Sequence, residues 1–294
     1  MIGALAALTY ILSTIFAIAG MGAAGVLVPN YIALGLSVYT AITLALAQNI
    51  ADLAVVTALH TRRGLVDWKK VATVAAPAVM LVPLGVYIAV HTPRIIILVA
   101  FGAFLVFALY RLTAPPAPPS GKKSGGIAAA LGAAEGVIAG LIGMDAAPIA
   151  LIAYSYLHND PKKISANTAA TALIVSATAF TTYLYALHTT HGISIGYTAV
   201  LLVMAAGAAG GATGAKLVHR VKPVHVRATM IAVLSLALAE IAAKIAKAGL
   251  PGEAAAAALI ASLAIILAKA TKKPTTRPQR IKTLEEAKQQ RRTR

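Results

Sequence analysis

Apolar stretches long enough to cross a lipid bilayer recur along most of this chain, and they restrict its fold more than any other feature. A helix needs about 20 apolar residues to cross the hydrocarbon core, which is about 30 Å thick. Full spans are predicted at residues 41–59, 70–90, 95–112, 163–187, 195–218, 225–247 and 254–269. The sequence therefore predicts an all-α, polytopic membrane protein.

Composition excludes an ordinary soluble domain and restricts the partners. Hydrophobic residues make up 59% of the chain and charged residues 12%, whereas soluble domains carry about 25% charged residues. The net charge of +17 is concentrated at one end, because ten of the 26 Lys and Arg residues lie between Lys269 and Arg294. This distribution disfavours a nucleic-acid partner and predicts a cytoplasmic tail that attracts anionic membrane lipid.

The chain contains an internal repeat on either side of a Pro-, Gly- and Lys-rich linker. Gly20-Met21-Gly22-Ala23-Ala24 recurs as Gly143-Met144-Asp145-Ala146-Ala147. Chance similarity between Ala/Gly-rich segments is the alternative, but the order of matching features in the two halves favours a repeat. The predicted organisation is repeat 1 at 1–112, a cytoplasmic linker at 113–125, repeat 2 at 126–250, a final helix at 251–270 and a basic tail at 271–294.

Each repeat is predicted to begin with a re-entrant type of helical hairpin followed by three spans. Residues 1–37 and 126–157 each hold an apolar arm, a Gly/Ala break and a second arm of about a dozen residues, which reaches roughly 18 Å. Basic residues place the 62–70 loop and the linker in the cytoplasm, whereas the 188–195 loop has no Lys or Arg and is expected outside. The two halves are then inverted, in the plasma membrane, with the N-terminus outside and the C-terminus in the cytoplasm.

The two breaks are the predicted binding site for a small anion. We name Gly20–Pro29 the first break and Gly143–Pro148 the second break. Helix N-termini at bilayer depth present free N–H groups and a positive dipole end, which suit anions. Close helix packing is the alternative role of these glycines, but two such breaks in inverted halves favour a site. The predicted substrate-binding residues here are Gly22, Ala23, Ala24, Gly25, Ala146 and Ala147.

Polar side chains on the helix after each break are expected to face that site. In the first half Gln48, Asn49 and Asp52 lie at i, i+1 and i+4. Their counterparts in the second half have the same spacing and are Asn167, Thr168 and Thr171. Asn, Gln and Asp inside a span are costly and usually face a cavity or a partner. Asp52 is therefore predicted to serve coupling, and the other five residues are predicted to bind substrate.

Carboxylates within apolar segments are candidates for proton coupling. Asp145 lies in the second break, where burial would raise a carboxyl pKa and let the group carry a proton. Glu135 lies in the first arm of its hairpin, and the sequence does not separate a role in gating from one in packing. Glu240 is expected to form an ion pair with Lys244 at i+4. The histidines show no metal-ligand spacing, and no hydrolase motif occurs, so the sequence predicts no enzyme, no metal and no cofactor.

Three motifs resemble the TauE/SafE family, also called the 4-toluenesulfonate uptake permease family. Its hallmark is a glycine-rich break ending in Val-Pro, and the segment from Gly20 to Val28-Pro29 is similar to it. His60 to Trp68 resembles the family's basic loop running into Gly-x-Val-Asp-Trp, and the second break is similar to the second glycine motif. The departures are Ala23 and Ala24, where glycines are usual, and the acid Asp145.

The resemblance implies transport of small sulfur anions such as sulfite, sulfoacetate or other sulfonates. The predicted function is therefore an anion transporter that works by alternating access, with proton coupling through Asp145. A passive anion channel, a non-transporting membrane scaffold and an intramembrane enzyme are the alternatives. The sequence leaves open the identity of the anion, the direction of transport, the driving ion and the oligomeric state, including a homo-oligomer.

Overall fold

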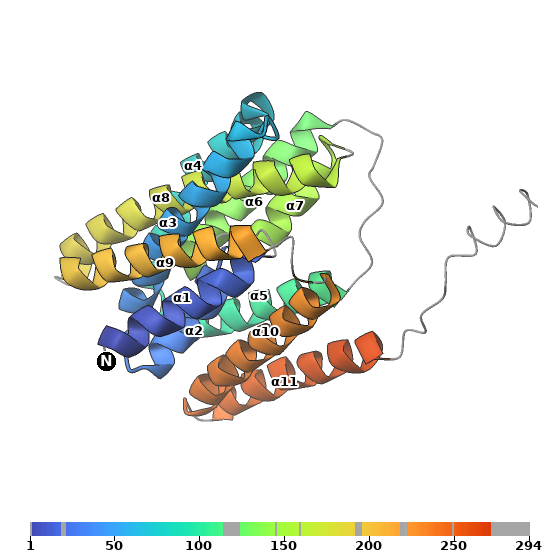
Figure 1. Cartoon of the computed structure of the whole chain (residues 1–294). Coiled ribbons are helices and arrows are strands. Elements are labelled where there is room, and N and C mark those ends of the chain that lie inside the picture. Colours follow the sequence, from blue (N-terminus) through green and yellow to red (C-terminus); the bar gives the residue numbers. More distant parts are fainter. Residues whose placement is uncertain are drawn as a thin grey trace, which may run out of the picture.

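The computed structural model consists of helices joined by short connections (Figure 1). It describes residues 2–18, 22–113, 124–144, 146–158, 160–191, 196–217, 221, 223–248 and 250–271. The helices there are α1 (Ile2–Ile18), α2 (Ala24–Ala33), α3 (Val38–Arg62), α4 (Trp68–His91), α5 (Arg94–Thr113), α6 (Gly125–Ile142), α7 (Ala147–Ser155), α8 (Pro161–His191), α9 (Tyr197–Leu217), α10 (Pro223–Ala246) and α11 (Leu250–Thr271).

Side-chain caps fix where several of these helices begin. Ser37 Oγ accepts a hydrogen bond from the Thr40 N–H at 3.2 Å at the start of α3, and Ser124 caps α6 in the same way. The Asp67 carboxylate accepts the Lys70 N–H at 3.3 Å at the start of α4. Such caps satisfy N–H groups that the first helical turn leaves without partners.

Seven helices are long and apolar enough to cross a membrane, as judged over the fully described residues: α3, α4, α5, α6, α8, α9 and α10. Six of these correspond to predicted full spans. The seventh, α6, was expected to be a hairpin arm rather than a full span, but its 18 residues reach about 27 Å. In contrast, the fully described part of α11, Pro251–Leu267, belongs with the shorter apolar helices.

The two helices predicted as second arms are short, as expected. Helix α2 has 10 residues and α7 has 9, so each reaches only about 15 Å or less. The helices flanking the predicted linker extend slightly into it, since α5 ends at Thr113 and α6 begins at Gly125. The rest of the linker and residues 272–294 lie outside the described residues.

The helices pack in two groups. In the larger group α1 and α3 pack against α9, while α6 and α8 pack against α4, and α3 crosses α8. In the smaller group α5, α10 and α11 pack against one another, with α10 and α11 along the lower edge of Figure 1. The main connection between the groups joins α10 to α2. Helix pairs therefore exchange partners between the two halves of the sequence.

Glycines let α6 approach α4 closely enough for backbone contact. A Cβ atom at Gly132, Gly136 or Gly140 would overlap a carbonyl oxygen of α4, belonging to Val74, Ala78 and Val82 respectively. These glycines lie at i, i+4 and i+8 and so share one face of α6. Small residues at such spacing are the usual basis of tight helix pairing in membranes. They therefore allow α6 to pack directly against the backbone of α4.

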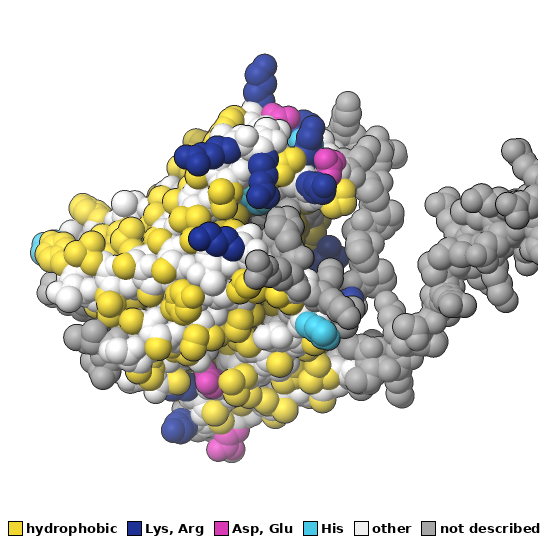
Figure 2. Space-filling model, viewed as in Figure 1, with side chains coloured by type: hydrophobic (Ala, Val, Ile, Leu, Met, Phe, Trp, Pro, Cys, Tyr) yellow, Lys and Arg dark blue, Asp and Glu magenta, His cyan; other side chains and the backbone are white. Residues whose placement is uncertain are grey.

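Basic residues gather at one end of the molecule, and the sides are largely apolar (Figure 2). Contacts between Asp67 and Asn167 and between Lys70 and His158 place the α3–α4 and α7–α8 connections at the same end. The expected Glu240–Lys244 pair is not in direct contact: the charge of Lys244 acts on Glu240, but no ion pair within 4 Å joins them among the described residues. Lys244 Nζ instead donates to the Ile32 carbonyl at 3.0 Å, near the end of α2, and the ion pair found among the described residues joins Lys70 to Asp67.

Candidate functional site

Both breaks end in a helix whose first turn has no side-chain cap. The N-cap residues are Ala23 for α2 and Ala146 for α7, and neither alanine can accept a hydrogen bond through its side chain. Pro148 lies in the first turn of α7, where the missing N–H is tolerated. Both second arms therefore begin inside the predicted breaks, and no side chain caps their first N–H groups.

The two breaks meet in space although more than a hundred residues separate them. Met144 of the second break packs against Gly25 of the first, with its Cε 2.5 Å from where a Cβ of Gly25 would lie. Gly143 has a positive φ of 66° and ends α6, with its Cα against the side chain of Ile42. The two segments that resemble each other in sequence are thus in contact in the structure.

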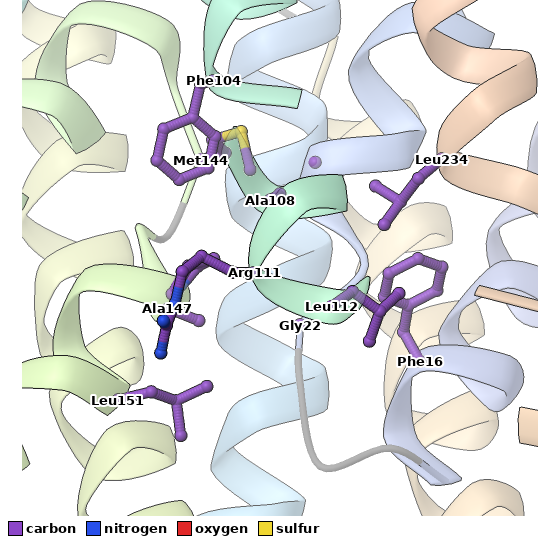
Figure 3. Close-up of a pocket in the computed structure, with 12 residues that line it drawn as sticks. Phe16, Gly22, Phe104, Ala108, Arg111, Leu112, Met144, Ala147, Leu151 and Leu234 are labelled. Carbon is purple, nitrogen blue, oxygen red and sulfur yellow. The ribbon is translucent and has the colours of Figure 1, made fainter. Parts of the chain in front are cut away.

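A cavity of about 140 Å³ lies beside this contact (Figure 3). Its walls combine both helix groups: α1, the first break and the second break on one side, and α5 and α10 on the other. The lining residues are Phe16, Gly22, Gly25, Phe104, Ala108, Arg111, Leu112, Met144, Ala147, Pro148, Leu151 and Leu234. The volume equals that of roughly four or five water molecules at about 30 Å³ each, which suits a small solute.

Arg111 is the charged residue in this lining, and sequence reasoning missed it. The side chain extends from the last turn of α5 toward Ala147 and Leu151 (Figure 3). The signal was its register, because Phe104, Ala108 and Arg111 lie at i, i+4 and i+7 and so share one face of a helix. At the end of an apolar span an arginine resembles an ordinary topology marker, and the neighbouring elements were needed to show the cavity.

The polar residues of α3 lie at two different contacts. Asn49 is fully buried against Gly22 of the first break and donates to Ser176 Oγ of α8 at 2.9 Å. Gln48 donates to Ser13 Oγ of α1 at 2.7 Å, and Asp52 packs against Gly211 of α9. The structure thus brings Asn49 to a break, while Gln48 and Asp52 lie between α1, α3 and α9. None of the three lines the cavity.

The counterparts on α8 are also buried and lie outside the cavity lining. Asn167 Oδ1 accepts the Asp67 N–H at 2.8 Å, and its amide nitrogen lies 2.6 Å from His158 Nε2. Thr171 shares a 2.5 Å hydrogen bond with the Tyr154 hydroxyl of α7, which ties α8 to the second arm. Thr168, next to Asn167 in the sequence, is 2% exposed. Their roles in substrate binding stay predictions.

The remaining predicted residues divide between the cavity wall and the backbone around it. Gly22, Gly25 and Ala147 line the cavity. Ala23, Ala24 and Ala146 are buried within the same breaks but do not line it. Asp145, the predicted coupling residue, lies outside the described residues, directly after the lining residue Met144. In the part of the chain that the structure describes, no three His, Asp or Glu side chains lie close enough to hold a metal ion.

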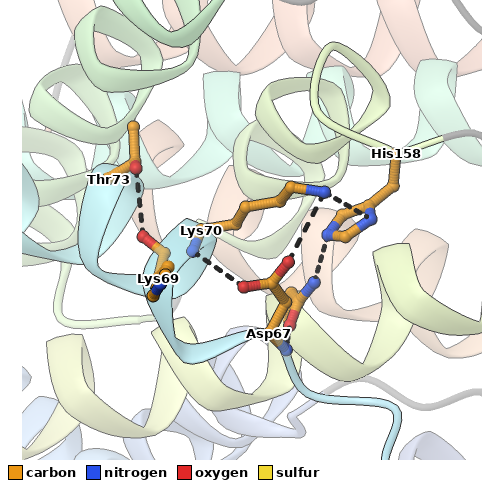
Figure 4. A network of polar contacts seen from close by, with 6 residues as sticks. Asp67, Lys69, Lys70, Thr73 and His158 are labelled. Atoms are coloured by element: carbon orange, nitrogen blue, oxygen red, sulfur yellow. Dashed lines mark hydrogen bonds and ion pairs between the residues drawn. The ribbon is translucent and has the colours of Figure 1, made fainter.

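A polar network joins the two halves at the basic end of the molecule (Figure 4). Lys70 Nζ lies 3.5 Å from Asp67 Oδ2 and 3.3 Å from His158 Nδ1. Burial and then the charge of Lys70 lower the pKa of His158 below its usual 6.5. Burial would raise the pKa of Asp67, but the Lys70 N–H and ammonium outweigh it and lower that pKa. The network therefore favours a neutral imidazole and a charged carboxylate.

These features define a multi-pass, all-helical membrane protein with a small internal cavity between two interrupted helices. The chain matches the model of the sulfite exporter TauE/SafE family over residues 5–241, and it belongs to that family. The match extends from α1 into α10 and includes both breaks and the cavity. No curated protein and no solved structure gives a significant match.

Family membership confirms the resemblance read from the sequence and fixes the class of activity. Members of this family are transporters, so the protein is a membrane transporter and not an enzyme. The alternative of an intramembrane enzyme is thereby removed, and an anionic substrate follows from the same membership.

Proposed function

We propose that the protein carries a small sulfur oxyanion or organosulfonate, such as sulfite or sulfoacetate, by alternating access, and that the cavity between the breaks is its substrate site. The observation that carries this proposal is the cavity itself, because both breaks and a cation line it. The first turns of α2 and α7 support it further. Their positive dipole ends and their N–H groups, for which no side-chain cap competes, favour an anion.

Movement of the two helix groups is the proposed route to alternating access. The cavity lies between them, with Phe104 and Leu234 from the smaller group facing Gly25 and Ala147 from the larger. A relative shift of the groups would change access without unfolding any helix. The exchange of packing partners, α1 with α9 and α6 with α4, supports our further proposal that the two halves are inverted repeats.

Two further parts of the proposal concern coupling and orientation. Asp145, in the second break, would take up a proton during the transport cycle, because a charged carboxylate at bilayer depth is costly. We place the basic end, with Arg63 and Lys162, in the cytoplasm of a plasma-membrane protein, together with the tail, which would contact anionic lipid.

Flux measurements in proteoliposomes test the proposed function. The wild type should move sulfite, methanesulfonate or sulfoacetate, whereas liposomes without protein should not. Concentrative uptake driven by a pH gradient would establish a carrier, and purely downhill flux would favour the passive channel. A well-folded protein that moves none of these anions would contradict the proposal and favour a scaffold.

Filling the cavity at the first break should abolish transport. A leucine at Gly25 would clash with Met144 and project into the cavity, since the Met144 Cε lies 2.5 Å from where a Gly25 Cβ would lie. We expect Gly25→Leu to insert and to lose at least nine-tenths of the flux. Gly3→Leu is the matched control, because no atom lies within 4 Å of a Cβ at Gly3 of α1. Equal flux in both variants would place the substrate elsewhere.

A further inference from the structure

We infer that Arg111 is the residue that holds the charged group of the transported anion in the cavity. This inference rests on the proposed function for the identity of the solute, but the anion site that it assigns can be tested independently of transport. The inference begins from the composition of the wall. Apart from Arg111, the lining side chains are aliphatic, aromatic or Met, or belong to Gly and Pro.

The environment of the guanidinium indicates a ligand rather than a structural partner. The ion pair found among the described residues joins Lys70 to Asp67, and no hydrogen bond from Arg111 to another described residue is found. Arg111 is nevertheless only partly exposed, near the end of an apolar helix. A charge held between apolar walls is costly without an opposite charge, and a bound anion would supply one.

Guanidinium chemistry suits the head group of a sulfur oxyanion. Its planar fork donates parallel N–H bonds to two oxygens of one oxyanion, and this geometry adds specificity as well as energy. Ala147 and Pro148, in the first turn of α7, line the same cavity, so an anion beside Arg111 would also meet the positive end of that helix. Phe16, Leu112 and Leu234 lie across the cavity and would contact the rest of the solute.

Arg111 also lies at the boundary between the two helix groups whose relative movement is proposed above. It belongs to α5 in the smaller helix group, whereas Ala147 and Gly25 belong to the breaks in the larger group. An anion bound between them would bridge the two groups. Arg111 would therefore act as the cation through which substrate links the groups during the cycle.

Charge-selective labelling tests the anion site without any transport assay. The chain has no cysteine, so Ala108→Cys places one thiol in the cavity wall, one turn before Arg111. Tyr110→Cys is the matched control, because Tyr110 lies on the same helix, is 56% exposed and is not part of the lining. Each is treated with a negatively charged sulfonatoethyl methanethiosulfonate reagent and with its positively charged trimethylammonioethyl analogue.

The negative reagent should react preferentially at Ala108→Cys, and methanesulfonate should slow that reaction. Adding Arg111→Gln should lower the ratio of negative to positive reagent rates by about tenfold or more, since one charge in a cleft changes local ion concentration by that order. The ratio at Tyr110→Cys should stay within about twofold. An unchanged ratio at Ala108→Cys after the Arg111→Gln substitution would overturn the inference.

Transport gives the second measurement. Arg111→Gln should raise the half-saturating concentration of the transported sulfite or methanesulfonate by about tenfold or more, the range for losing a charge-assisted hydrogen bond. Arg111→Lys should fall between, because lysine keeps the charge but loses the fork. Arg227→Gln is the control, because Arg227 donates to the Thr113 carbonyl at the same end of α5 and does not line the cavity.

The two assays separate failure of this inference from failure of the proposed function. In one outcome the wild type moves no sulfur anion but still shows the Arg111-dependent labelling ratio. That result would support the anion site and contradict the proposed transport. Conversely, the wild type could transport sulfur anions while Arg111→Gln changes neither the half-saturating concentration nor the labelling ratio. That result would support the proposed transport and contradict the role of Arg111. If Arg111→Gln does not fold, Arg111→Lys replaces it in both assays. The inference is contradicted if Arg111→Lys has the half-saturating concentration of the wild type and if methanesulfonate does not slow the labelling of Ala108→Cys.

Discussion

At the scale of single residues, Asp145 and His158 are the groups whose protonation should matter most. Asp145 follows Met144, which lines the cavity, and so lies in sequence beside the proposed substrate site. His158 does not line the cavity and belongs to the network that joins the α3–α4 and α7–α8 connections. We therefore expect protonation of Asp145 to affect transport and protonation of His158 to affect stability.

Replacing Asp145 by Asn should remove the pH dependence of transport while leaving the fold intact. A charged aspartate at bilayer depth costs about 2.5–3.5 kcal/mol, so a neutral amide should insert at least as well. The measurement is anion flux at mildly acidic and mildly alkaline pH for the wild type and Asp145→Asn in the same liposomes. Asp160→Asn, at an exposed position, is the control. An unchanged pH response in Asp145→Asn would remove this residue from coupling.

Acidification should destabilise the protein through His158. Its folded pKa is lowered, so the neutral form is favoured by folding, and that stability is present above the unfolded value of 6.5. It is lost as pH falls from there through the lower folded pKa, because the unfolded chain binds the proton first. As the pH is lowered from 6.5 toward the folded pKa, the melting temperature should fall in the wild type and fall less in His158→Gln. His188→Gln, at an exposed site, should behave as the wild type does.

At the scale of elements, the contact between α4 and α6 should depend on the absence of side chains along one face. Gly136→Ala would place a methyl group against the Ala78 carbonyl, and backbone cannot move aside as a flexible side chain can. Overpacking of this kind costs about 1–3 kcal/mol or more. Gly126→Ala, on the same helix with no atom within 4 Å, should be neutral or slightly stabilising.

Thermal unfolding in detergent distinguishes the two alanine variants. The prediction requires a clear loss for Gly136→Ala and none for Gly126→Ala. Equal melting temperatures would mean that α4 and α6 separate readily, and that their close approach contributes little to the stability of the larger helix group.

At the scale of the whole molecule, the proposed inverted arrangement predicts the side from which each loop can be labelled. Single cysteines at Arg63 and Lys162 should react with an impermeant reagent from the same side, because the structure brings their loops to one end. A cysteine at Ser194, in the 188–195 loop, should react from the opposite side. Labelling of Arg63→Cys and Ser194→Cys from one side would contradict the inverted repeat.

Much of this protein was predictable because membranes restrict the backbone so strongly. Lipid offers no hydrogen-bond partner, so long apolar stretches must be helices, and hydropathy located six of the seven candidate spans. The breaks could be found because glycine and proline disrupt a helix locally, and α2 and α7 begin inside them. The span that sequence analysis did not predict, α6, shows the limit: its position before the second break suggested a hairpin arm, whereas it has 18 residues and packs closely on α4.

The partners of individual side chains were decided by tertiary structure. Asn167 was predicted at the substrate and is bonded to the α3–α4 connection, and Lys244 bonds Ile32 rather than Glu240. Arg111 entered the cavity only when α5 came to lie beside both breaks. Sequence by itself determined most of the helices and the family, since these follow from local composition and motifs. Which side chains meet at the cavity depends on how distant helices pack, and periodicity along one helix carries no information about that.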